Sequence, residues 1–289
     1  MSRVTICLTE RCNLDCKYCF RKVTNVEDIE CDNILDFMHR LNKVETIDEI
    51  YLTGGEPFLY KDLEKLLIKC NSVCNNLYIL TNGILLNDKN IALAKKYKVK
   101  LHVSLDSYDA RYHNIYRGGH SVIMKNLKIL KNDPSIEINL NVTLSPLNLD
   151  QISLIEIFAE ESGFTTDYSI LSVDSNMENS WYKMKSNDIS KLYNELSLWA
   201  QKNNRSIKLK FFNYILKNKN AKLKQCIYCK NNFVIKTNGD VCACFNNDNL
   251  YYGNIILEHP KKIIERYQTS MPELKYEDCF SLNCAGTYL

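Results

Sequence analysis

The sequence lacks the features of several protein classes. No run of about 18 apolar residues occurs in its 289 residues, so no membrane-spanning helix is predicted. No charged segment followed by an apolar one opens the chain, so no export signal is predicted. Nine glycines and five prolines are too few for a collagen-like or low-complexity chain. A net charge of +3 is too small to indicate nucleic-acid binding. We therefore expect a folded, cytoplasmic protein with neither a membrane nor a nucleic-acid partner.

Cysteine, in contrast, is abundant. The chain has 13 cysteines, an odd number in a sequence without an export signal. Metal ligation or thiol chemistry is therefore expected rather than a disulfide framework. Nine of the 13 fall in two clusters, one near each end of the chain. The members of the two clusters are Cys12, Cys16 and Cys19, then Cys226, Cys229, Cys242, Cys244, Cys279 and Cys284.

Strand and helix patterns alternate from residue 3 to about residue 172. Segments of helical length and periodicity separate six predicted strands, at 3–9, 49–53, 77–81, 99–105, 135–143 and 165–171. Alternating units of this kind form a parallel sheet. Six strands are too few to close an eight-stranded barrel. The sequence therefore predicts an α/β fold, a partial (βα)6 TIM barrel.

Apolar and polar residues alternate along these predicted strands, most clearly in 136–143 and 101–106. Helices are expected to cover the apolar side, which leaves polar side chains pointing into the barrel. We expect a polar lumen that binds a ligand. A solvent-exposed sheet face is the alternative explanation of the same pattern.

The first cysteine cluster lies in the loop after the first predicted strand, at the end of the sheet where barrel enzymes place their active sites. Three thiolates within eight residues can hold three corners of a four-iron cluster and leave one iron open. A closed zinc site is the alternative, and it needs a fourth, distant ligand.

The spacing within this cluster resembles a known signature. Three residues separate Cys12 from Cys16, two separate Cys16 from Cys19, and Tyr18 precedes the last cysteine. This pattern is similar to that of the radical S-adenosylmethionine (SAM) superfamily. The resemblance implies a [4Fe-4S] cluster bound by the three cysteines and by SAM. It also implies reductive cleavage of SAM to a 5′-deoxyadenosyl radical that abstracts hydrogen, with the protein supplying binding and orientation.

Later segments match the same family at successive strand ends. Gly54-Gly55-Glu56-Pro57 is similar to the turn that binds the SAM amino group. Arg117, within His113–Gly118, is implied to pair with the SAM carboxylate. For Ser104 and Asp106, a role in forming a turn explains the residue types equally well. The remaining candidates for contact with SAM are Tyr18, Asn82, Ser104, Asp106, Asn141 and Thr143.

The spacing of Cys229, Gly239 and Cys244 resembles the opening of the C-terminal domain called SPASM, or its shorter form, Twitch. Residues 237–240 predict a hairpin turn that brings Cys229 and Cys244 to the base of one hairpin. A full SPASM domain holds two auxiliary clusters and needs more cysteines than remain. We therefore expect one auxiliary [4Fe-4S] cluster in a truncated domain, with four-cysteine zinc as the alternative. The candidate ligands are Cys226, Cys229, Cys244, Cys279 and Cys284.

Two interpretations remain open in this region. Cys226 is as good a first ligand as Cys229, and the surplus Cys242 is either inert or a hydrogen-atom donor, as in related peptide epimerases. The stretch 196–225 holds eight Lys or Arg and no acid. Such a run is a solvated face or a docking surface for an acidic leader peptide.

The predicted division is a partial barrel over 1–186, a basic bridging segment over 187–224 and an iron–sulfur domain over 225–289.

The resemblance implies an enzyme that modifies peptides by crosslinking, epimerisation or oxidation. Because the chain begins at its first strand, leader recognition is expected from a separate protein or another surface. An electron donor such as flavodoxin or ferredoxin is the second expected partner. There are three alternatives: a small-molecule radical SAM dehydrogenase, an enzyme like the GTP cyclases, and a non-catalytic iron–sulfur sensor. The cyclase is considered because its cysteine spacing is close to that of Cys229 and Cys244.

Overall fold

The structure is a computed structural model that describes residues 2–19, 28–171, 185–202, 232–244 and 251–270. The elements in chain order are β1 (Ser2–Cys7), α1 (Cys31–Leu41), β2 (Ile47–Thr53), η1 (Pro57–Leu59), α2 (Leu63–Cys70), β3 (Cys74–Thr81), α3 (Asp88–Lys96), β4 (Lys100–Ser104), α4 (Ala110–Tyr116), α5 (His120–Ile129), β5 (Ile138–Leu144), η2 (Leu149–Gln151), α6 (Ile152–Ser162), β6 (Thr165–Ile170), α7 (Ser186–Lys202), β7 (Asn232–Ile235), β8 (Asp240–Cys242), β9 (Tyr251–Asn254) and α9 (Pro260–Ser270).

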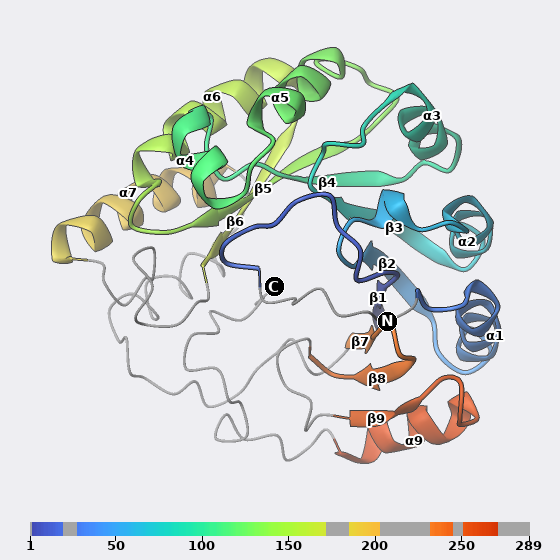
Figure 1. Cartoon of the computed structure of the whole chain (residues 1–289). Coiled ribbons are helices and arrows are strands. Elements are labelled where there is room, and N and C mark those ends of the chain that lie inside the picture. Colours follow the sequence, from blue (N-terminus) through green and yellow to red (C-terminus); the bar gives the residue numbers. More distant parts are fainter. Residues whose placement is uncertain (1, 20–27, 172–184, 203–231, 245–250, 271–289) are drawn as a thin grey trace.

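One sheet organises the molecule. Its strand order is β6-β5-β4-β3-β2-β1-β7-β8-β9, and β1 to β6 pair in parallel. The helices that connect these strands lie along the outer side of the curved sheet (Figure 1). The predicted α/β fold with a parallel sheet is therefore confirmed, and the carboxyl ends of β1 to β6 meet at one edge, where the connecting loops gather.

The predicted alternation along the strands is confirmed as well. In β5, Ile138, Leu140 and Val142 are at most 4% exposed, whereas Asn139 and Asn141 are partly exposed. The apolar side chains pack under the outer helices and form the core. We call the opposite side of β1 to β6, which carries the polar side chains, the inner face. Paired residues of neighbouring strands point to the same side, so the register of the sheet shows which inner-face residues are neighbours.

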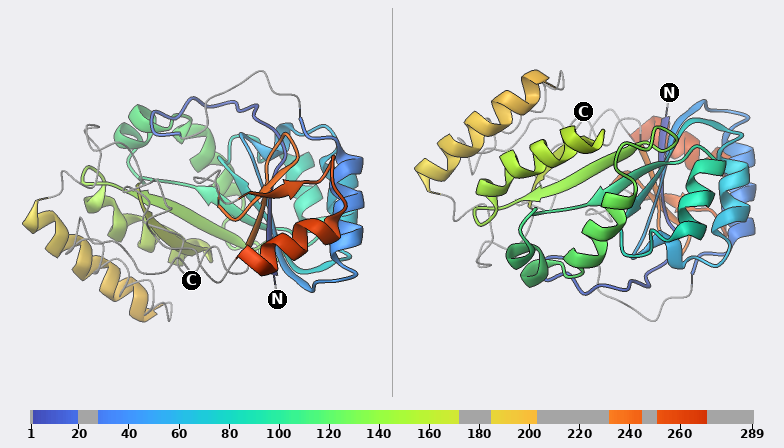
Figure 2. Two further views of the ribbon diagram at one scale, coloured as in Figure 1. Left: turned by 90° about the horizontal axis from the view of Figure 1, so that it is seen from below. Right: turned by 90° about the horizontal axis from the view of Figure 1, so that it is seen from above.

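Two features of the fold were not predicted. Residues 110–116 form α4, a short helix that begins where the Asp109 side chain accepts a hydrogen bond from the backbone N–H of Arg111. Strand β7 pairs in parallel with β1, from Arg3 opposite Asn232 to Ile6 opposite Ile235. The sheet therefore continues directly from the barrel into the C-terminal strands, which the views in Figure 2 show from below and above.

The predicted C-terminal hairpin is present. β7 and β8 pair antiparallel around the turn at residues 236–239, and β9 pairs with β8. On the outer side, Phe233, Tyr252 and Tyr267 form an aromatic cluster that joins α9 to these strands. The proposed boundaries at residues 186 and 225 lie in or beside segments outside the described residues, so the division into domains stays a prediction.

Among the described residues, no helix is both long and apolar enough to cross a membrane.

Candidate functional site

The first cysteine cluster lies in the loop that leaves β1 at the carboxyl edge of the sheet. Cys12 and Cys16 are partly buried and Cys19 is exposed. The backbone N–H of Cys19 donates to the carbonyl of Cys16 (2.9 Å), and that of Lys17 donates to the carbonyl of Tyr116 (2.9 Å). The cysteine loop is thus a tight turn anchored to the end of α4.

The three thiols are close enough to influence one another's ionisation. Burial raises the pKa of Cys16 to about 11, against the opposing effect of Arg117, and the charges of Cys19 and Cys12 raise it further. Burial also raises the pKa of Cys12. Both thiols are therefore protonated at neutral pH without a metal, and a bound metal would displace their protons.

This donor set fits an iron–sulfur cluster better than a single metal ion. In the described part of the chain, no three Cys, His, Asp or Glu side chains converge closely enough to hold one ion. A four-iron cluster is larger than an ion and takes one thiolate at each of three corners. Three thiols on one loop that influence one another's ionisation are compatible with a four-iron cluster. Cys12, Cys16 and Cys19 are the residues that would hold this cluster.

The Gly54-Gly55 turn lies directly against the start of the cysteine loop. The backbone N–H of Gly55 donates to the carbonyl of Thr9 (2.7 Å), and that of Glu56 donates to the carbonyl of Arg11 (2.8 Å). A Cβ on Gly55 would lie 2.1 Å from the carbonyl oxygen of Arg11, and Gly54 has a φ of +143°. Glycine is therefore required here because the two backbones are in contact.

Glu56 is fully buried and ties the ends of β2 and β3 together. Its carboxylate accepts hydrogen bonds from the Thr81 hydroxyl (2.8 Å) and from the backbone N–H of Asn82 (2.9 Å) and Phe58 (3.3 Å). Burial raises the pKa of Glu56, and these donors oppose the rise. Pro57, also buried, begins the short helix η1 that follows. Glu56 thus fixes the turn whose glycines contact the cysteine loop.

Asn82 contacts the cysteine loop from the end of β3. Its Nδ2 donates to Oδ1 of Asn13 (2.7 Å) and lies 3.7 Å from Sγ of Cys12. Its Oδ1 accepts from the backbone N–H of Ile84 (3.0 Å), which fixes the orientation of the amide. Asn82 is therefore placed to position Cys12.

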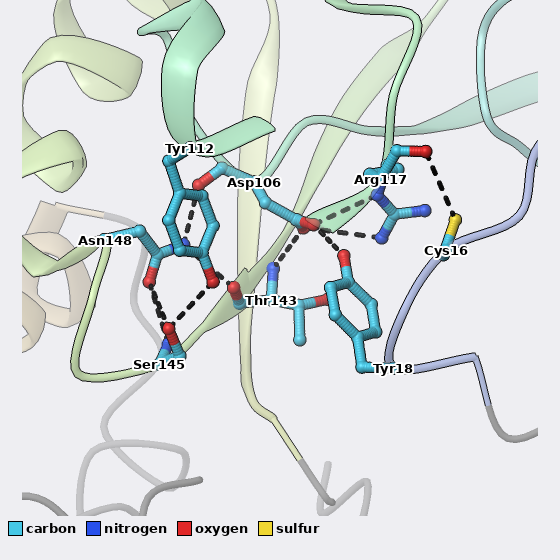
Figure 3. A network of polar contacts seen from close by, with 8 residues as sticks. All are labelled: Cys16, Tyr18, Asp106, Tyr112, Arg117, Thr143, Ser145 and Asn148. Carbon is cyan, nitrogen blue, oxygen red and sulfur yellow. Dashed lines mark hydrogen bonds and ion pairs between the residues drawn. The ribbon is translucent and has the colours of Figure 1, made fainter. Parts of the chain in front are cut away.

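Asp106 is the centre of the polar network in Figure 3. Its buried carboxylate forms an ion pair with Arg117 (Nε to Oδ2, 3.0 Å) and accepts from the Tyr18 hydroxyl and from the backbone N–H of Thr143 (3.0 Å). The Cys16 thiol lies 3.8 Å from the carbonyl oxygen of Arg117. One carboxylate therefore connects the cysteine loop, the segment after α4 and strand β5.

The predicted partner of Arg117 was the carboxylate of SAM, and in the structure its guanidinium pairs with Asp106. The side chain of Arg117 is 12% exposed. Its charge is retained because Asp106 compensates for burial and raises the pKa of Arg117. The guanidinium also lies 5.4 Å from the centre of the Tyr18 ring. These contacts hold the Arg117 cation beside the cysteine loop.

The other predicted contacts lie near the same edge of the sheet. Ser104 and Asn141 are register neighbours on the inner face, and they precede Asp106 and Thr143, respectively, by two residues. Sequence reasoning missed Asn148, whose Nδ2 donates to the carbonyls of Asp106 (2.7 Å) and Thr143 (3.0 Å). Its local sequence does not predict this role, because the strand end that carries Asp106 lies 42 residues away in the chain.

The second cysteine cluster is described only in part. Cys226, Cys229, Cys279 and Cys284 lie outside the described residues. Cys242 and Cys244 are buried in and just after β8. Cys242 is the register partner of Val234, which pairs with Thr5 on the inner face. Because side chains alternate along a strand, Cys242 belongs to the side of the sheet that faces into the barrel, whereas Cys244 lies two residues beyond the end of β8.

Comparison with known proteins gives consistent results. A family model described as the Radical SAM superfamily matches residues 6–153. A GTP 3′,8-cyclase of Clostridium botulinum (strain Hall) is 32% identical over 165 residues, which cover 54% of this chain and 49% of the relative. The chain therefore spans about half the length of this curated relative.

Solved structures share the fold at lower identity. Native anSMEcpe with bound AdoMet and Kp18Cys peptide has a TM-score of 0.71 and 18% identity, over 93% of this chain and 82% of that chain. SuiB of Streptococcus suis bound to its precursor peptide SuiA has a TM-score of 0.65 and 16% identity, over 84% of this chain and 59% of that chain.

Proposed function

Because this chain belongs to the radical SAM superfamily, we propose that it is a radical SAM enzyme that abstracts hydrogen from a peptide substrate. The observation that carries the enzymatic part is the family match over residues 6–153. The modification of the peptide would be a thioether or carbon–carbon crosslink, an epimerisation or an oxidation.

Cys12, Cys16 and Cys19 would hold the [4Fe-4S] cluster, with SAM on the remaining iron. When bound, these groups supply the one-electron cleavage of SAM that yields a 5′-deoxyadenosyl radical. The chain's own residues would position the cluster. Asn82 orients Cys12, and the Gly54-Gly55 backbone contacts the loop that carries all three cysteines.

Binding of SAM would use the cation and the polar groups beside this loop. Arg117 supplies the charge that a carboxylate requires, and Asp106 fixes the direction of its guanidinium. Tyr18 and the backbone of Thr143 hold Asp106 in turn. Ser104 and Asn141 offer neutral hydrogen-bonding groups on the adjacent inner face for the remaining polar atoms of SAM.

We assign an auxiliary [4Fe-4S] cluster to the C-terminal cysteines, with Cys244 as a ligand and its partners among Cys226, Cys229, Cys279 and Cys284. The buried position of Cys244 just after β8 supports its assignment as a ligand. Cys242 lies on the inner side of β8, and this position supports the assignment of Cys242 as a hydrogen-atom donor rather than an inert thiol.

A peptide substrate is supported by two structures of the same fold that hold peptides, those of anSMEcpe and SuiB. The partners proposed with it are an electron donor such as flavodoxin or ferredoxin and a separate protein that recognises a leader peptide. The second candidate function is a reaction like that of the GTP 3′,8-cyclases, which the 32% identity to the Clostridium botulinum relative supports.

The deciding experiment is an anaerobic assay of 5′-deoxyadenosine release. The reconstituted protein is incubated with SAM and dithionite, beside a Cys12→Ala, Cys16→Ala, Cys19→Ala variant. Product from the unaltered protein alone is expected, and deuterium from labelled peptides should then appear in that product. Label from GTP instead of peptide would favour the cyclase reaction. Failure to bind SAM at all would leave the iron–sulfur sensor as the better hypothesis.

A further inference from the structure

The positive charges on the inner face of β1 to β6 are already compensated by carboxylates of the chain itself. Within β1 to β6, the Lys and Arg residues on this face are Arg3 and Lys100. Arg3 pairs with Glu49 (2.7 Å), and Lys100 pairs with Glu137 (2.9 Å). Asp167, the register partner of Asn141, adds a further carboxylate. The inner face of these six strands therefore has no excess of fixed positive charge.

Aromatic rings lie on the same inner face, farther from the carboxyl ends of the strands than the cysteine loop. The rings of Tyr51 and Tyr78 stack with their centres 4.4 Å apart and their planes at 7°. The guanidinium carbon of Arg3 lies 4.8 Å from the centre of the Tyr51 ring, and Nζ of Lys100 lies 5.9 Å from the centre of the Tyr78 ring. Both cations therefore contact an aromatic ring as well as a carboxylate. We call these four residues the floor stack. The edge of His102 packs on both tyrosines, and the floor stack thus limits how deeply a substrate can enter.

One polar atom above the floor stack is unsatisfied. Oδ1 of Asn139 is buried and has no hydrogen-bond partner among the described residues. Nδ2 of Asn139 donates to the Thr165 hydroxyl (2.9 Å), which in turn lies 3.4 Å from the carbonyl oxygen of Ile138. Asn139 is the register neighbour of His102. A buried acceptor without a donor is costly unless something binds to it.

These observations indicate the chemistry of a ligand that would fit. A polyphosphate needs several Arg or Lys donors with uncompensated charge, and Arg3 and Lys100 are already compensated. A neutral group with an N–H or O–H donor would satisfy Asn139 without disturbing any ion pair. A peptide amide has these properties, and so does a neutral hydroxyl-bearing side chain.

We propose that the part of the substrate that enters the barrel is uncharged and donates a hydrogen bond to Oδ1 of Asn139, with the floor stack below it. This inference rests on the proposed function, because it concerns the same lumen, and it narrows the substrate class to neutral peptide segments rather than nucleoside triphosphates.

The first test measures nucleotide binding by calorimetry in the anaerobically reconstituted, SAM-loaded protein. GTP should show no saturable binding at millimolar concentration. The double variant Glu49→Gln, Glu137→Gln removes the partners of Arg3 and Lys100 without changing side-chain size, and it should gain at least about tenfold in affinity for tripolyphosphate. Saturable binding of GTP to the unaltered protein, or no gain in the variant, would overturn the neutral-lumen assignment.

The second test uses N-acetylglycine amide as a neutral peptide probe, with binding followed by saturation-transfer NMR. Replacing Asn139 by Leu should weaken binding by about tenfold or more, because the acceptor for the probe's N–H is lost. Asn76→Leu makes the same change on the inner face of β3, beside Glu49 and two residues before Tyr78, and should leave binding unchanged. Equal binding by the Asn139 and Asn76 variants would overturn the role of Asn139.

Both tests can be separated from the proposed function. Thermal unfolding shows whether the Asn139→Leu variant is folded, and Asn139→Ala removes the same acceptor with less bulk if it is not. Neither measurement requires turnover. A protein that passes both tests but transfers no label from peptides would refute the peptide-modifying reaction and leave the neutral lumen standing.

Discussion

Asp106 and Arg117 form an ion pair that is almost wholly removed from water. The two side chains are 0% and 12% exposed. Removing one partner of such a pair leaves a buried, uncompensated charge. Asp106→Asn should therefore lower the free energy of unfolding by about 3–5 kcal/mol. Chemical denaturation measures the loss, and Glu161→Gln, which breaks an exposed pair with Lys131, is the control and should cost less than about 1 kcal/mol. Equal losses would contradict the role of burial.

Gly55 is the residue at which the smallest possible substitution should affect the cysteine loop. The Cβ of alanine would lie 2.1 Å from the carbonyl oxygen of Arg11, so one backbone must move. We expect Gly55→Ala to reduce the iron bound after reconstitution by at least half. Gly163→Ala is the control, because its φ of +71° strains an alanine backbone but its Cβ would meet nothing closer than 3.5 Å. It should lower stability without changing the iron content, and a normal iron content in Gly55→Ala would refute the prediction.

His113 makes stability depend on pH. The ring is fully buried, neither nitrogen has a hydrogen-bond partner in the described structure, and burial lowers its pKa from 6.5 to about 4. Because the unfolded chain takes up the proton first, stability should fall as pH decreases from 6.5 to 4, by about 3 kcal/mol from this residue. Unfolding curves across this range should be flatter for His113→Leu than for the unaltered protein. Parallel curves would contradict the assignment.

At the scale of elements, β7 joins the C-terminal strands to the barrel through a short parallel ladder with β1, and Asn232 adds side-chain contacts at the start of that ladder. Nδ2 of Asn232 donates to the carbonyl of Ala243 (3.1 Å), and its Oδ1 lies 3.4 Å from the Thr5 hydroxyl. Asn232→Ala should accelerate amide hydrogen exchange in β7 and β8 while exchange in β3 to β5 stays unchanged. Asn238→Ala, in the exposed turn of the same hairpin, should have little effect. Uniform acceleration across the whole sheet would show that the two parts unfold together.

Elements were predicted where their signal is local. The alternation in 136–143 predicts β5, and residues 237–240 predict the turn between β7 and β8. The helix α4 was missed because it has only seven residues, too few for its periodicity to be recognised. The pairing of β7 with β1 was missed for a different reason, because a four-residue apolar strand carries no information about its partner.

At the scale of the whole molecule, the proposal places two clusters on separate parts of the chain. If they bind independently, the Cys12→Ala, Cys16→Ala, Cys19→Ala variant should lose about half of the iron. Cys279→Ala with Cys284→Ala should lose a similar amount, and combining both sets should remove nearly all of it. Iron and sulfide analysis measures these losses. An unchanged iron content together with a loss of zinc in the Cys279 and Cys284 variant would instead identify a zinc site.

The sequence by itself determined the family, because the spacing of Cys12, Cys16 and Cys19 and the Gly54-Gly55 turn are local patterns. It also determined the parallel sheet and its polar inner side, since side-chain alternation is a property of each strand alone. Only the tertiary structure decided which groups meet. Tyr18 and Asp106 are 88 positions apart, and Arg117 reaches Asp106 from the end of a helix that was not predicted. Likewise, the neutral lumen follows from pairs such as Arg3 with Glu49, which form only when strands distant in sequence lie side by side.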